Sequence, residues 1–137
     1  MASIHRSITI DQPAAVVWDA LRDVGALHTR LVVGFVVDCK LEGNVRNVTF
    51  ANGMTAREVI ISVDDEHKRV AWLATGGTLT HYNASAQAVA ASAASTEVRW
   101  IADLLPDEAT RMITVMIEQG LAAMKRTLES GDAAGRH

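Results

Sequence analysis

The last third of the chain contains one long amphipathic segment, and the strands before it are expected to curve around it. Pro106 fits the first turn of a helix, where a missing N–H costs nothing, and Asp107 and Glu108 place negative charge at the same end. Apolar residues then recur at three- and four-residue steps: Met112, Ile113, Met116, Ile117, Gly120, Leu121, Met124 and Leu128. This spacing predicts a helix over residues 106–128 with one wide apolar face.

Three methionines and a glycine on that face are unusual. Methionine is unbranched and adaptable, and Gly120 removes side-chain volume in mid-helix at a cost of about 1 kcal/mol against alanine. A methionine stripe at helical spacing is usually ordinary core. A face with so little fixed volume can also border an internal space, and both interpretations stay open at this point.

The sequence before this segment predicts one strand, two short helices and six further strands. Alternating or β-branched runs place the strands at 3–10, 31–41, 45–50, 54–63, 69–75, 79–89 and 96–104. A helix beginning at Pro13, capped by Asp11 or Gln12, and a second helix at 24–30 lie between the first two strands. Short connections imply an antiparallel meander, and one long helix on its face makes the fold α+β. The gap between sheet and helix is a natural site for an apolar ligand.

The pair Asn52-Gly53 is the strongest hairpin signal in the sequence. A three-residue loop would place Arg46 opposite Glu58 on neighbouring strands, and a two-residue loop would shift the register by one. We favour the three-residue loop because it opposes the two unlike charges.

Strand periodicity indicates which side chains face the helix. One face of the last strand carries Thr96, Val98, Trp100, Ala102 and Leu104, and we expect it to point inward. On the strand before it, the inward set is Tyr82, Ala84, Ala86 and Ala88, whose small side chains leave volume unfilled. The alternation in 69–75 does not decide the orientation of that strand.

Composition narrows the classes of function. Hydrophobic residues make up 49% of 137 residues and the net charge is −3, which favours a packed domain and argues against nucleic acid as a partner. The single cysteine, Cys39, excludes an internal disulfide and a cysteine-rich zinc site, and no His spacing suits a metal. We expect one domain over 1–130, a frayed tail over 131–137, and a cytoplasmic protein without cofactor or stable membrane insertion. A homodimer is left open.

Several motifs resemble a known superfamily. The opening pattern is Ile8-x-Ile10-x-x-Pro13-x-x-x-Val17-Trp18-x-x-Leu21, which is similar to the start of SRPBCC, or START-like, helix-grip proteins. The later series is Gly43-x-x-Arg46, Asn52-Gly53, Glu58, Asp64-Asp65 and Arg69, which resembles the polyketide cyclase/dehydrase and lipid-transport subgroup. The segment Gly76-Gly77-x-x-x-His81-Tyr82-x-Ala84 is similar to plant abscisic acid receptors and the birch pollen allergen group, although the adjoining loops are shorter here.

The resemblance implies a helix-grip fold, in which a curved seven-stranded antiparallel sheet surrounds the C-terminal helix and two short helices close one end. It also implies a deep, mostly apolar cavity between sheet and helix. The ligand-binding residues that it implies are Arg46, Glu58, Trp72, Ala74, Tyr82, Ala84, Val98, Trp100, Met112, Met116 and Gly120.

Arg46, Glu58 and Tyr82 are the candidates for chemistry beyond packing. The charged pair could orient a ligand or act as acid and base, or it could be a cross-strand ion pair that satisfies two charges removed from water. Tyr82 could donate its hydroxyl to a ligand or simply pack. Trp72 and Trp100 could stack on a flat ring or belong to the core.

Three functions are compatible with these residues. The first hypothesis is binding of a small hydrophobic or aromatic molecule in the cavity. The alternative is a lyase of the cyclase/dehydratase kind, in which Arg46 polarises a carbonyl and Glu58 or Tyr82 moves a proton. A second alternative is a non-catalytic accessory protein that acts through its surface.

Overall fold

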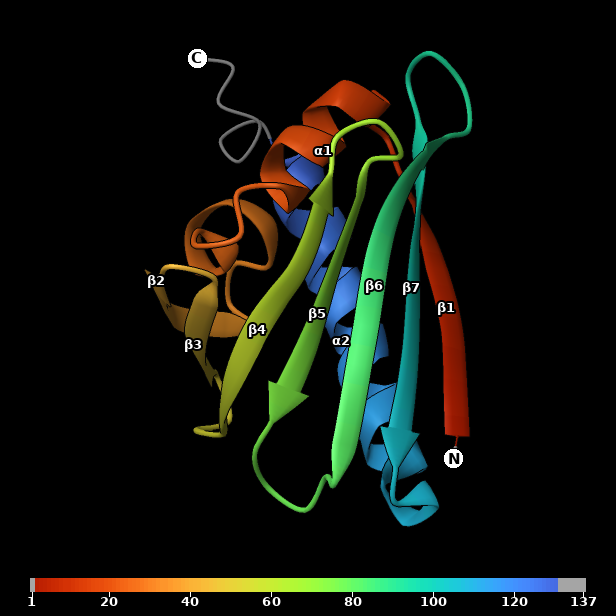
Figure 1. Ribbon diagram of the computed structural model, residues 1–137. Helices are drawn as coiled ribbons and strands as arrows, with labels where there is room; N and C mark the ends of the chain where they lie inside the picture. Colours follow the sequence, from red (N-terminus) through yellow and green to blue (C-terminus); the bar gives the residue numbers. More distant parts are fainter. Residues whose placement is uncertain (1, 131–137) are drawn as a thin grey trace.

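The computed structural model describes residues 2–130, which form a seven-stranded antiparallel sheet and one long helix (Figure 1). The predicted frayed tail over 131–137 lies outside the described residues. The strands are β1 (Ala2–Ile10), β2 (Val36–Glu42), β3 (Val45–Phe50), β4 (Thr55–Asp64), β5 (Arg69–Thr75), β6 (His81–Ala90) and β7 (Thr96–Leu105). The helical elements are α1 (Ala14–Leu21), η1 (Leu27–Leu31), η2 (Asp107–Ala109) and α2 (Thr110–Glu129).

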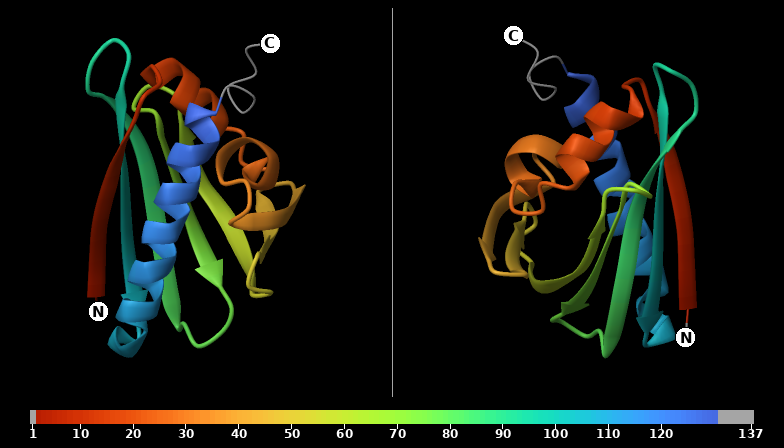
Figure 2. Two further views of the ribbon diagram at one scale, coloured as in Figure 1. Left: turned by 180° about the vertical axis from the view of Figure 1, so that it is seen from behind. Right: turned by 45° about the horizontal axis from the view of Figure 1, so that its top comes forward.

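The strand order is β1-β7-β6-β5-β4-β3-β2, so each strand from β2 to β7 pairs with its neighbours in sequence. The chain crosses once, after β1, and α1 and η1 make this crossover. Helix α2 runs diagonally across one face of the sheet, as the view from behind shows (Figure 2). The predicted α+β class and helix-grip arrangement are therefore confirmed, because the sheet surrounds a single long helix.

The predicted register of the β3–β4 hairpin is confirmed. Arg46 pairs with Glu58 across the two strands, and the Phe50 N–H donates to the Met54 carbonyl over 2.8 Å. Gly53 lies in this turn with φ of 90°, a left-handed conformation that glycine adopts without strain. The turn thus fixes which charged residues meet farther along the hairpin.

The predicted inward faces are confirmed as well. Tyr82 and the alanines on its face of β6 are buried, as are most of the alternating set on β7. On β5, where the alternation did not decide the orientation of the strand, Trp72 points inward and is 6% exposed. An irregularity in the β4–β5 register between Ile60 and Ser62 leaves Ile61 on the opposite, outer face.

The start of α1 differs from its predicted capping. Pro13 occupies the N-cap, and Asp11 and Gln12 bind the end of α2 instead of capping α1. The Asp11 N–H donates to a carboxylate oxygen of Glu129 over 2.8 Å, and the Gln12 amide donates to the Leu128 carbonyl over 2.9 Å. These bonds tie the first turn after β1 to the last turn of α2.

The second predicted helix, 24–30, is wrong in extent and type. The chain turns at 22–26 and then forms η1, a five-residue π-helical turn. Gly25 packs against β2 at this point, since a Cβ there would lie 3.1 Å from the Leu41 Cβ. The strand predicted at 31–41 begins only at Val36, because Leu31 belongs to η1 and Gly34 has φ of 86°.

The predicted start of the long helix at Pro106 is also too early. Pro106 is extended, with ψ of 160°, and a 3-10 turn at η2 precedes α2. The Thr110 hydroxyl donates to the Asp107 carbonyl over 2.6 Å at this junction. The acidic residues therefore lie in the short turn ahead of the α-helix and not in its first turn.

Candidate functional site

A cavity of about 430 Å³ lies between the sheet and α2. Most of its lining is apolar and comes from β2 to β7, η1 and α2. Its exposed lining residues gather at one end and include Gly53, Met54, Gly76, Gly77 and Met112. The β3–β4 turn, the β5–β6 loop and the first turns of α2 share that end of the molecule, the lower end in Figure 1. The mouth of the cavity is therefore framed by these three segments.

Arg46 and Glu58 place a buried ion pair on the sheet wall of the cavity. Their residues are 4% and 8% exposed, and Nε of Arg46 donates to Oε1 of Glu58 over 2.7 Å. Nη1 of Arg46 also donates to the Val24 carbonyl over 3.2 Å. The guanidinium carbon lies 5.3 Å from the centre of the Trp72 ring, within the range of a cation–π contact. The guanidinium of Arg46 is thus held by three different contacts.

Aromatic side chains continue the wall from this pair. Trp72 and Trp100 meet edge to face, with ring centroids 5.7 Å apart and an interplanar angle of 70°. The indole N–H of Trp100 is buried and has no hydrogen-bond acceptor of good geometry among residues 2–130. It nevertheless lies close enough to the Tyr82 hydroxyl to influence its ionisation.

The hydroxyl of Tyr82 is a neutral hydrogen-bond donor in this setting. Burial raises the pKa of Tyr82 well above its ordinary value of 10.0, the Glu58 carboxylate raises it further, and the Trp100 indole only partly opposes this. The phenol therefore stays neutral at physiological pH. It can donate a hydrogen bond to a ligand oxygen, and the high pKa makes it unsuited to act as a base.

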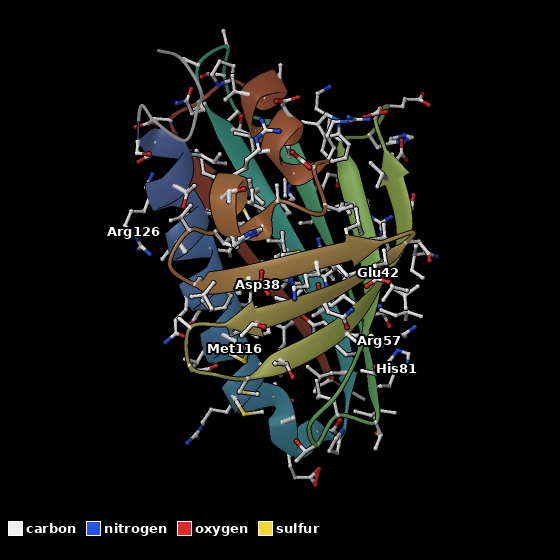
Figure 3. All side chains as sticks on the ribbon, turned by 90° about the vertical axis from the view of Figure 1, so that its left-hand side faces the viewer. Asp38, Glu42, Arg57, His81, Met116 and Arg126 are labelled. Carbon is white, nitrogen blue, oxygen red and sulfur yellow. The ribbon has the colours of Figure 1, made fainter. Side chains whose placement is uncertain are left out.

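The helix wall is formed by α2. Met112 and Met116 line the cavity, and Figure 3 shows Met116 on α2 behind the β3–β4 hairpin. Ile113, Ile117 and Met124 line it as well. Both isoleucines are also buried, so they serve packing and lining at once.

The cavity brings together most of the residues that the sequence and the resemblance suggested. These are Arg46, Glu58, Trp72, Ala74, Tyr82, Trp100, Met112 and Met116. Ala84, Val98 and Gly120 are not among its lining residues in the described part of the chain. Gly120 instead lets the Trp100 and Phe35 side chains approach α2 closely, because a Cβ there would lie 3.1 Å from Trp100 and 3.3 Å from Phe35.

Sequence reasoning missed the lining near η1 and the mouth. The missed residues include Leu27, Leu31, Val32, Phe35, Phe50, Met54 and Leu79. Phe35 and Phe50 meet edge to face with centroids 5.4 Å apart. The three-residue turn between β3 and β4 brings Phe50 and Met54 together. No periodicity linked these residues to η1, because the conformation of η1 was predicted incorrectly.

The other candidate groups have structural partners. Cys39 is buried, burial raises the pKa of its thiol, and Sγ contacts the Val24 carbonyl at 3.8 Å. His81 lies on the outer face and its Nε2 is 2.6 Å from the Asn83 amide oxygen. Asp65 accepts hydrogen bonds from the Trp18 indole and from Arg22. In residues 2–130 no group of three or more metal-ligating side chains gathers, and no helix there is long and apolar enough to span a bilayer.

Solved structures with this arrangement establish the fold of the chain. A protein from Bacillus thuringiensis matches with a TM-score of 0.84 and 19% identity, covering 94% of this chain and 100% of that chain. The di-domain ARO/CYC BexL from the BE-7585A biosynthetic pathway matches with a TM-score of 0.81 and 18% identity, covering 94% of this chain and 47% of that chain. Norcoclaurine synthase from Thalictrum flavum matches with a TM-score of 0.73 and 21% identity, covering 99% and 87% respectively.

No curated protein matches this sequence. The family match is more informative, since it extends over residues 1–129 and includes every strand, the short helix α1, the long helix α2 and the cavity between sheet and α2. The chain belongs to the polyketide cyclase/dehydrase and lipid transport family.

Proposed function

We propose that this protein binds a small hydrophobic or aromatic molecule in the cavity between the sheet and α2. The observation that carries the proposal is the cavity itself, whose volume of about 430 Å³ lies in the range of small-molecule sites, about 300–1,000 Å³. Its apolar lining would supply the affinity by removing ligand surface from water. The few polar groups in it would fix the orientation.

The polar groups favour a ligand that carries an acceptor oxygen. Tyr82 offers a neutral hydroxyl beside the unpaired Trp100 N–H, and Arg46 offers a cation held in place by Glu58. A carbonyl or phenolic oxygen would satisfy such donors, and leaving a buried donor without a partner costs about 1–3 kcal/mol. A planar ring would meet the edge-to-face tryptophans.

Two measurements test binding. Native mass spectrometry of the purified protein should reveal a co-purified small molecule. Calorimetric titration should then show that 9-fluorenone binds more tightly than fluorene, which has the same rings without the carbonyl, by about 2- to 10-fold for one hydrogen bond.

A pair of matched variants tests whether the ligand binds in this cavity. Ala74→Phe fills the cavity from β5 and should weaken fluorenone binding at least about tenfold. Ala90→Phe adds the same bulk at the exposed end of β6 and should leave binding unchanged. Binding that is equal in both variants, or no bound molecule in either measurement, would contradict the proposal.

A second candidate function is catalysis of a cyclisation or dehydration, which the Arg46–Glu58 pair on the cavity wall favours. Arg46 would polarise a carbonyl and Glu58 would move a proton, with Tyr82 as a donor to the developing oxyanion. The test is turnover of polyketide-like substrates by a folded Arg46→Ala variant, and full turnover would exclude this role. The accessory function is less favoured, because Trp72, Trp100 and Met116 surround open space instead of a filled core.

A further inference from the structure

The outer face of the sheet, opposite α2, exposes large apolar side chains. Figure 1 looks onto this face, with α2 behind the strands. Ile61, Leu73 and Ile101 are 57%, 38% and 37% exposed, and they line one shallow hollow together with Ala71 and Ser85. Large apolar side chains that gather in one hollow offer a partner surface that it can remove from water.

The strand register arranges the centre of this patch in a row. Ile101 pairs with Ser85, and Ser85 pairs with Ala71, so the three side chains lie side by side across β7, β6 and β5. Ser85 is small and only 7% exposed, so it lies recessed between its two apolar neighbours. Ile61, displaced by the irregularity in β4, extends the patch beyond Ala71. The row therefore crosses the sheet perpendicular to its strands.

Charged groups of opposite sign border the row. Arg99 and Asp103 lie two residues before and after Ile101 on the same face of β7, about 13 Å apart along the strand. Arg99 is 52% exposed and pairs with Glu97 over 2.7 Å. Asp103 accepts hydrogen bonds from the Ser3 hydroxyl and, over 3.0 Å, from the Asn83 amide. These local partners hold both charges at the surface of the face.

This pattern is self-complementary under a two-fold rotation. An axis along the row of Ile101, Ser85 and Ala71 exchanges the two sides of the row between facing copies. Arg99 of each copy then lies over Asp103 of the other, and the row with Ile101 meets its own image. A two-fold interface repeats every contact, so both ion pairs form together.

We propose that this face binds a second copy of this chain in a sheet-to-sheet dimer, with the row that contains Ile101 at its centre and two reciprocal Arg99–Asp103 pairs at its border. Sheets pack face to face in this way about 10 Å apart. An anionic lipid surface fits less well, because Asp103 and Glu97 on the same face would repel it. The cavity opens elsewhere, so the dimer does not depend on the ligand proposed above.

Charge reversal provides the test, with the dissociation constant measured by sedimentation over a concentration series. Arg99→Asp and Asp103→Arg each turn two attractive pairs into repulsive ones, and each should raise the constant at least about tenfold. Mixing the two single variants should restore association as a heterodimer, because each then supplies the charge that the other lacks. The double variant should also associate like the wild type. Arg111→Asp, exposed on α2, is the matched control and should change nothing.

A measurement on the wild type avoids any dependence on variant folding. In amide correlation spectra, dilution should shift the signals of Ala71, Ser85 and Ile101 and leave those of β2 in place. A chain that stays monomeric at about 1 mM, the scale of a weak contact, overturns the proposal. Dilution shifts that are confined to another surface overturn it as well. The same holds if each folded single variant associates with itself as tightly as it does with the other variant in the mixture.

Discussion

Replacing Arg46 by methionine tests how much the fold depends on the buried ion pair. The substitution Arg46→Met keeps an unbranched side chain but leaves the Glu58 carboxylate on the cavity wall without its cation. Removing one partner of a buried pair costs about 3–5 kcal/mol, since the remaining charge stays desolvated. The lost cation–π contact with Trp72, at 5.3 Å, accounts for about 0.5–2 kcal/mol of this cost.

The companion variants separate pairing from burial. Arg46→Met combined with Glu58→Leu removes both charges, and we expect it to recover most of the stability, to within about 1 kcal/mol of the wild type. The coupling free energy from the four proteins should then exceed about 2 kcal/mol. Arg6→Met is the control, because Arg6 contacts Glu118 over 3.1 Å at the surface, with side chains 43% and 56% exposed. An exposed pair of this kind contributes only about 0.2–1 kcal/mol.

Urea denaturation followed by tryptophan fluorescence measures all five proteins. A destabilisation by Arg46→Met no larger than that of the surface control would contradict this prediction. Additive effects of the two single substitutions in the double variant would contradict it as well. Either result would mean that the cavity hydrates these charges, so that the pair would be free to serve a ligand at little cost to the fold.

Three further predictions concern single positions. Gly120→Ala should lower the free energy of unfolding by about 1 kcal/mol, because overpacking against Trp100 at 3.1 Å outweighs the gain in helix propensity; urea titration decides, and stabilisation would contradict it. Tyr82, the only tyrosine, should show no tyrosinate absorbance in the native protein near pH 10 but ionise normally in urea. Its raised pKa gives stability that is full below pH 10 and lost as the pH rises toward the folded value. Asp65 has a lowered pKa, caused by Arg22 and Trp18, so its contribution is present above 3.8 and lost as the pH falls through the folded value; Asp65→Asn should remove this acid-sensitive part of the urea midpoint.

The hairpin register and strand faces could be predicted because they depend on local rules. Asn52-Gly53 fixed the turn, the turn fixed the pairing of Arg46 with Glu58, and alternation fixed the inward side of β7. The extent of the cavity could not be predicted this way. Its lining depends on the position of η1 over the sheet. The close contact between Gly25 and Leu41 of β2 helps to set that position, and this contact is tertiary.

The role of Gly120 shows the same limit. A glycine within an amphipathic helix predicts missing volume, and the sequence alone could not say whether the volume stays open. The structure fills it with Trp100 of β7 and with Phe35, which directly precedes β2. The open space lies instead beside Ala74 and Ala86, where small residues on β5 and β6 face the helix.

The pairing of β1 with β7 has a consequence for the order of folding. Ala2 lies opposite Leu104 and Ile10 opposite Thr96, so β1 has its partner, β7, far away in the sequence. Its apolar side chains, including Ile4 and Ile10, must wait for β7 before they can be buried. Contacts of such long sequence separation slow folding and leave strand edges exposed meanwhile. The bonds from Asp11 and Gln12 to the end of α2 form only after α2 has been synthesised as well.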